Sequence, residues 1–118
     1  MRSHPERGAA TAELALVLPL LVTVTVGLVW LQAVGAAQVR AVDAARETAR
    51  ALARGDDEAQ ALARGARVAP EDSTVRAVQV GDEVRVTVTG TVPGPGGLFA
   101  RLPAPHVHAE AVAVSELP

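Results

Sequence analysis

The 118-residue chain contains no cysteine, no lysine and no tyrosine, and its only aromatic residues are Trp30 and Phe99. Without cysteine it has no disulfide, thiol nucleophile, cysteine metal site or lipoprotein-type acyl anchor. Without lysine it has no phosphate-binding glycine loop of the kind that ends in lysine. Scarce aromatics argue against a stacking platform for nucleic acid, and the net charge of −2 does not attract a polyanion.

Charge is also missing from one long stretch, because no charged residue occurs between Glu13 and Arg40. This apolar run exceeds the about 20 residues that a transmembrane helix needs. As a helix it would be roughly 39 Å long, whereas the hydrocarbon layer is roughly 30 Å thick, so its ends are expected outside lipid. Glu13 lies at the start of the run, where a carboxylate is costly in lipid, and is therefore a candidate functional residue.

Three interpretations of this N-terminal part compete. The first is a secretory signal peptide cleaved near Ala33–Ala37, although the usual apolar core of such a peptide is only about 7–15 residues. The second is a permanent single-span anchor with an intact leader. The third is a prepilin-like signal that is cut after Gly8 on the cytoplasmic side, so that the leader 1–8 is lost and the helix is kept.

The order of residues from Gly8 to Pro19 favours the third interpretation. Gly8 is followed by four small residues, then Glu13, then an apolar run with an early proline, Pro19. This combination resembles the N terminus of TadE-like pilus-assembly proteins, which are minor pseudopilins of tight-adherence (Flp-type) pili. The resemblance implies cleavage after Gly8 by a prepilin peptidase, leaving Ala9 as the new N terminus. Many type IV pilins have an aromatic first residue, so their N-terminal methylation does not carry over to Ala9.

The resemblance also implies a location and partners. It implies a single-pass protein of the cell membrane, with a cytoplasmic N terminus and an extracytoplasmic C-terminal part, and with the pilus as a further location. The implied partners are the prepilin peptidase, other pilin or pseudopilin subunits and the assembly platform, with no nucleic acid. Enzyme activity and a cofactor are not expected. The alternative is a membrane-anchored extracytoplasmic binding module with an uncleaved leader.

Glu13 and Pro19 have predicted roles in helix register and assembly. After cleavage, the Ala9 amine and the Glu13 carboxylate lie four residues apart on one helix face. Glu13 could then pair with its own amine or with that of a neighbouring subunit and set the axial register of a helix bundle. The alternative is that Glu13 only lies at a solvent-exposed helix end and has no role in assembly. Pro19 lies inside the helix, removes a backbone hydrogen bond and is expected to bend it.

The sequence predicts two helices, the first of which contains the apolar run and continues beyond it. The first helix is expected from about Ala10 to Arg54, with a narrow apolar stripe and with Asp43–Arg46 and Glu47–Arg50 spaced to form ion pairs. The stripe comprises Val42, Ala45, Ala49 and Leu52. The second helix is expected at 57–67, capped by Asp56 or Asp57 and ended by Pro70. Its predicted inward residues are Ala59, Leu62, Ala63 and Ala66.

A period of two in the last third predicts strands. Valines alternate with polar residues on both sides of Gly81-Asp82, which predicts a β-hairpin, and 106–114 alternates again as a third strand. The predicted class is therefore α+β and pilin-like: a long transmembrane helix continuing into a stalk, a short second helix and a small three-stranded antiparallel sheet. The predicted segments are a cleaved leader (1–8), a transmembrane helix (9–37), an extracytoplasmic helical part (38–69) and a β region (70–118).

The predicted third strand contains one candidate metal site. His106, His108 and Glu110 occupy alternate positions and therefore share one face, and two imidazoles with a carboxylate can bind Zn²⁺. The alternative is a solvated strand face, and no further ligand stands out in the sequence. No metal site is therefore predicted, and this trio is only a weak candidate.

Overall fold

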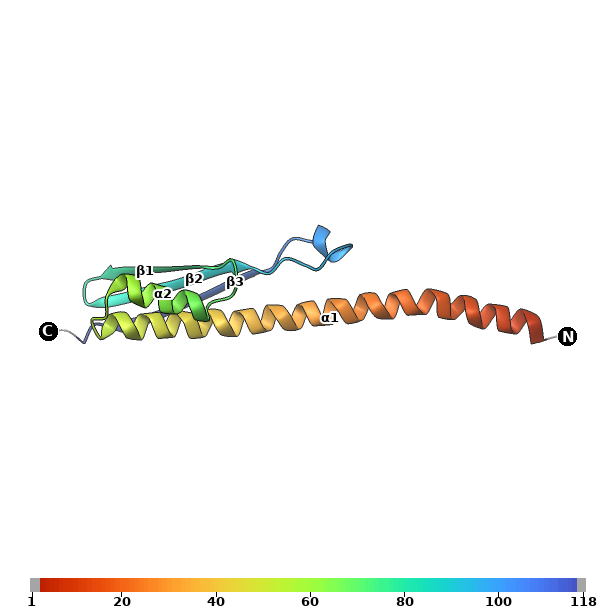
Figure 1. Cartoon of the computed structure of the whole chain (residues 1–118), viewed down its shortest axis with the longest axis horizontal. Coiled ribbons are helices and arrows are strands. Elements are labelled where there is room, and N and C mark those ends of the chain that lie inside the picture. Colours follow the sequence, from red (N-terminus) through yellow and green to blue (C-terminus); the bar gives the residue numbers. More distant parts are fainter. Residues whose placement is uncertain (1–2, 117–118) are drawn as a thin grey trace.

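The computed structural model describes residues 3–116, with side chains from Glu6 onward, and shows an elongated α+β molecule of 90 × 20 × 19 Å. The elements are a long helix α1 (Ser3–Ala53), a short helix α2 (Glu58–Val68), strands β1 (Thr74–Val80) and β2 (Glu83–Thr91), a 3₁₀ turn η1 (Phe99–Arg101) and strand β3 (His106–Val114). Figure 1 shows α2 and the sheet gathered on one half of α1, while the other half extends alone. The predicted α+β class is confirmed.

The long helix α1 is the axis of the molecule. It begins at Ser3, earlier than expected, and so includes most of the predicted leader; Met1 and Arg2 lie outside the described residues. Figure 1 shows a bend in its orange-red part, the region that contains Pro19. Proline has no N–H, so one helical hydrogen bond is missing there. The Thr23 hydroxyl donates to the Pro19 carbonyl at 2.8 Å and gives that oxygen an additional partner.

The sheet has the order β1-β2-β3, and both strand pairs are antiparallel. Val80 pairs with Glu83 across the two-residue loop Gly81-Asp82. Gly81 has a φ of +64°, whereas Asp82 is not among the positive-φ residues, as in a type II′ turn with glycine first. The predicted hairpin and third strand are therefore confirmed.

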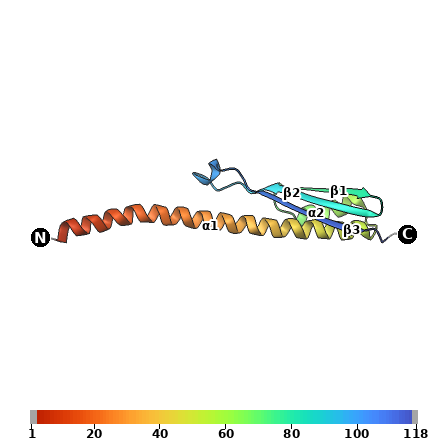
Figure 2. The same ribbon diagram turned by 180° about the vertical axis from the view of Figure 1, so that it is seen from behind.

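The core lies between the inner face of the sheet and the second half of α1 (Figures 1 and 2). β2 contributes three buried valines, Val84, Val86 and Val88, and α1 contributes a row of small residues that lets the sheet approach closely. This row comprises Ala37, Ala41, Ala44, Ala45 and Ala49. The predicted stripe is confirmed at Ala45 and Ala49, but the buried face of α1 is wider than predicted. The reason is that α1 is covered twice, by the sheet and by α2.

The predicted inward face of α2 is wrong. Ala61 and Gly65 are the buried residues of α2, whereas Leu62 is only partly buried. The other three predicted positions are exposed: Ala59, Ala63 and Ala66. A Cβ on Gly65 would overlap Thr48 Oγ1 of α1, so the two helix backbones meet where a side chain is missing. Apolar periodicity gives no weight to glycine and therefore could not place this contact.

A glycine with positive φ, an N-cap and two ion pairs define the junction between α1 and α2. Gly55, with a φ of +90°, follows α1, and Asp57 is the N-cap of α2, accepting a hydrogen bond from the Gln60 N–H at 3.3 Å. Asp56 forms ion pairs with Arg54 at 3.5 Å and with Arg64 at 3.2 Å. This junction turns α2 back along α1.

Candidate functional site

The first part of α1 extends away from the sheet and α2 (Figures 1 and 2), and its segment Leu14–Val22 is an uncovered apolar rod. Every side chain from Leu14 to Val22 is exposed. α1 is long and apolar enough to cross a membrane, and none of its most apolar 18-residue window is buried against the rest of the protein. These features fit a single-pass membrane protein.

The predicted processing site lies within a regular part of α1. Gly8 and Ala9 are both exposed and helical, and a Cβ added to Gly8 would have no neighbour within 4 Å. The Thr11 hydroxyl donates to the Arg7 carbonyl at 2.9 Å and bridges the predicted cut. Cleavage would therefore require the first turns to unwind. Gly8 eases this, because a glycine inside a helix costs about 1 kcal/mol relative to alanine.

Glu13 lies one helical turn after Ala9, on the same side of α1. Its side chain is exposed. Among the described residues, its carboxylate forms no ion pair within 4.0 Å and no hydrogen bond. The acid at the start of the apolar rod therefore has no ion-pair partner among the side chains from Glu6 to Glu116.

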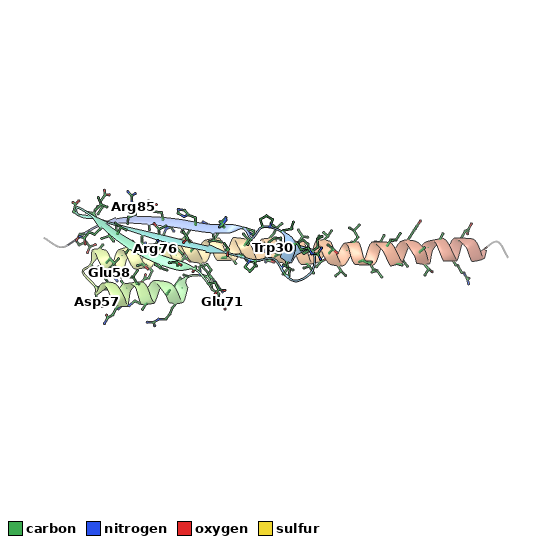
Figure 3. All side chains as sticks on the ribbon, turned by 90° about the horizontal axis from the view of Figure 1, so that it is seen from above. Trp30, Asp57, Glu58, Glu71, Arg76 and Arg85 are labelled. Atoms are coloured by element: carbon green, nitrogen blue, oxygen red, sulfur yellow. The ribbon has the colours of Figure 1, made fainter. Side chains whose placement is uncertain are left out.

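A second feature was not anticipated from the sequence: the loop at 92–105, between β2 and β3, docks on α1. The Trp30 indole N–H donates to the Val92 carbonyl at 3.1 Å, and the ring meets Phe99 edge-on with centroids 5.6 Å apart. A Cβ on Gly27 would lie 3.0 Å from Phe99 Cζ, so the Phe99 ring lies directly on the helix backbone. Figure 3 shows Trp30 at the end of the sheet, where this loop meets α1.

This docking places residues of the β2–β3 loop beside residues of the predicted transmembrane segment. Gly27 and Trp30 belong to the predicted span 9–37, yet they contact the β2–β3 loop. An apolar groove lies between α1 and the β2–β3 loop, and it is lined mostly by leucine, valine and aromatic side chains. Its lining includes Val24, Leu28, Leu31, Val34, Leu98 and Phe99. The signal that could have revealed it is the clustering of Leu98, Phe99 and Leu102 in an otherwise Gly- and Pro-rich loop.

The weak metal candidate falls on the outer face of the sheet. His106, His108 and Glu110 are all exposed, as the alternation predicted. Glu110 forms an ion pair with Arg85 of β2 at 3.5 Å. Among the side chains that the structure describes, from Glu6 to Glu116, no three His, Asp or Glu residues come close enough to hold a metal ion. The backbone carbonyl of His108 instead accepts a hydrogen bond from Gln38 Nε2 at 2.8 Å, which ties β3 to α1.

A groove lined by arginines lies between α1 and α2. It contains four arginines and two acids: Arg46, Arg50, Arg64, Arg67, Asp43 and Glu47. The ion pairs predicted within α1, Asp43–Arg46 and Glu47–Arg50, are not among those formed by the described residues. The spacing along one helix suggested local pairing, whereas the packing of α2 adds two further arginines to the same groove.

Comparison with known protein families gives a match to part of α1. The family model described as TadE-like protein matches residues 8–50, which lie entirely within α1. The resemblance drawn from the sequence is confirmed over this segment, and it points to a role in the assembly of tight-adherence pili. No curated protein and no solved structure matches the chain.

Proposed function

From the similarity of residues 8–50 to TadE-like proteins, we propose that this chain is a minor pseudopilin or assembly factor of a tight-adherence pilus. It is processed after Gly8 and packs against other pilin or platform helices through α1. The observation that carries this proposal is the uncovered apolar stretch of α1, which follows Gly8, four small residues and Glu13. Among the side chains that the structure describes, Glu13 has no ion-pair partner.

Cleavage after Gly8 changes the charge at the start of the apolar rod. The leader contains Arg2 and Arg7, and charged groups of this kind hold a segment at the aqueous interface because moving them into lipid costs several kcal/mol. Removing the leader leaves one new amine at Ala9 together with Glu13. The processed helix can therefore leave the bilayer more easily, and its N terminus belongs on the cytoplasmic side.

Glu13 serves to set register between subunits. Its unpaired carboxylate is available to the Ala9 amine of the same chain or of a neighbour. A buried ion pair is weak evidence for stability, because desolvation offsets much of the attraction, whereas fixing register is its best-attested use. In a bundle of otherwise similar apolar helices, this pair distinguishes one axial position from the next.

The sheet and α2 form the extracytoplasmic part in this proposal. They cover only the second half of α1, so the first half remains available for helix packing (Figure 1). The chain is a substrate of the prepilin peptidase rather than a catalyst. Its partners are the membrane, the peptidase and the other pilus subunits.

The test is the N-terminal sequence and intact mass of protein extracted from membranes of cells that carry the pilus system. Wild-type protein is expected to start at Ala9, and Gly8→Val is expected to keep the leader and abolish assembly. Glu13→Ala is expected to be cleaved and inserted normally but to fail in assembly. Glu6→Ala is the matched control, because it removes an exposed carboxylate from the discarded leader.

Two results would contradict the proposal. Wild-type protein that keeps its leader, together with a harmless Glu13→Ala, would indicate the alternative, a membrane-anchored binding module. A start near Gln38 would indicate a secreted protein. Cleavage near Gln38 would also separate Trp30 from the Val92 carbonyl, to which the indole N–H donates a hydrogen bond.

A further inference from the structure

The β2–β3 loop, residues 92–105, combines apolar exposure with very little charge. Leu98 is 63% exposed and Leu102 is 46% exposed, although Leu98 lines the apolar groove between the loop and α1. Arg101 is the only charged residue of the loop. Such a segment is unfavourable in water and well suited to a membrane interface, where an arginine can extend to lipid phosphates while its neighbours enter the acyl region.

The position of the loop along α1 is the second observation. α1 is uncovered on all sides only up to Val22, and partly covered residues begin at Thr23. From Ala9 to Val22 the helix rises roughly 20 Å, whereas the hydrocarbon layer is roughly 30 Å thick. A bilayer that starts near Ala9 therefore extends beyond Val22, to the level where Phe99 lies on Gly27.

The backbone of the loop is suited to an environment with little water, such as the membrane interface. Four of its residues are prolines, which have no N–H to satisfy: Pro93, Pro95, Pro103 and Pro105. The Val92 N–H donates to the Pro105 carbonyl at 3.1 Å, and the Leu102 N–H donates to the Phe99 carbonyl at 3.2 Å. Irregular backbone is tolerated at membrane depth where it packs on protein and its polar groups have partners.

We propose that the β2–β3 loop is a second membrane contact, which inserts Leu98 and Leu102 into the lipid leaflet on the sheet side and places Arg101 among the lipid phosphates. The loop then holds the sheet and α1 in a fixed position relative to the bilayer. It fixes the height of the sheet above the bilayer and the rotation of α1 within it. This inference depends on α1 spanning the membrane and is independent of processing or pilus assembly.

The test uses the absence of cysteine from the chain. Leu98→Cys is labelled with an environment-sensitive NBD fluorophore in full-length protein reconstituted into phosphatidylcholine–phosphatidylglycerol vesicles. The matched control is Val80→Cys at the far end of the sheet, since Val80 is 61% exposed and Leu98 is 63% exposed. We expect the Leu98 probe to emit at shorter wavelength, to be quenched by nitroxide groups on the acyl chains, and to be several-fold less sensitive to iodide than the Val80 probe.

Two outcomes would overturn the inference. One is equal iodide quenching of both probes, which would place the loop in water. The other is shielding of the Leu98 probe that disappears as the protein is diluted into more lipid, because this would show that a second copy of the chain covers the loop. Shielding that is independent of dilution supports lipid contact. Both outcomes can be read on uncleaved protein, so they are separate from the processing test.

Discussion

The Trp30 indole N–H and the Val92 carbonyl oxygen are 3.1 Å apart, although 62 positions separate the two residues in the chain. The same indole meets Phe99 at an interplanar angle of 61°. The only two aromatic residues of the protein therefore hold the β2–β3 loop against α1. This contact connects the apolar rod of α1 to the end of the sheet.

Replacing Trp30 with phenylalanine should release the loop from α1. The substitution keeps an aromatic ring but removes the N–H, so the Val92 carbonyl loses its partner at a cost of about 1 kcal/mol. Amide hydrogen exchange measured by mass spectrometry should become roughly five-fold faster in residues 92–105. Leu20→Phe, at an exposed position of α1 away from the loop, should leave this exchange unchanged. Equal exchange in the Trp30→Phe variant and the wild type would show that the hydrogen bond does not hold the loop.

Gly27 should not tolerate a side chain while the loop is docked. A Cβ there would lie 3.0 Å from Phe99 Cζ, and the branches of valine would push the ring away. Trp30 is the only tryptophan, so Gly27→Val should shift its fluorescence emission and raise its accessibility to acrylamide. Gly35→Val is the matched control, because a Cβ added at Gly35 has no neighbouring atom within 4 Å. Identical tryptophan spectra for the two variants would contradict the docked arrangement.

Local patterns predicted much of this fold. The hairpin depends on alternating valines and the Gly81-Asp82 turn, both of which are short-range signals, and the long helix depends on an unbroken apolar run. The residues of the candidate processing site were likewise visible as a linear motif, Gly8 to Pro19. Their roles stay predictions until the N terminus is measured.

Contacts between distant segments could not be predicted in the same way. The α2 face depends on the missing side chain of Gly65, which an apolar pattern does not count. The docking of the loop depends on Phe99 reaching Gly27, and nothing near either residue marks the other as its partner. Surface pairs such as Asp43 with Arg46 satisfy the helical spacing, yet exposed pairs of this kind gain too little energy to be fixed by spacing alone.

The N-cap of α2 should contribute measurably to its stability. Asp57 accepts a hydrogen bond from the Gln60 N–H, and removing such a cap costs about 1 kcal/mol. Asp57→Ala should therefore speed hydrogen exchange in the first turn of α2 several-fold, whereas Asp57→Asn should stay close to wild type because asparagine also caps well. If alanine and asparagine behave alike, the hydrogen bond is not the source of the stability.

The contact of Gly65 with Thr48 can be tested by a double-mutant cycle. Alanine in place of glycine should favour an isolated helix by about 1 kcal/mol, but the new Cβ would overlap Thr48 Oγ1, and overpacking of this kind costs about 1–3 kcal/mol.

Gly65→Ala should therefore lower the free energy of unfolding of the α2 region, measured by hydrogen exchange of its amides in detergent. Thr48→Ala removes the Oγ1 that would clash while leaving a helix-favouring residue. In that background Gly65→Ala should become neutral or stabilising, which gives a coupling energy of about 1 kcal/mol or more. If instead Gly65→Ala has the same effect whether residue 48 is threonine or alanine, then the two helices do not meet at this pair, and the close approach of α2 to α1 must be located elsewhere.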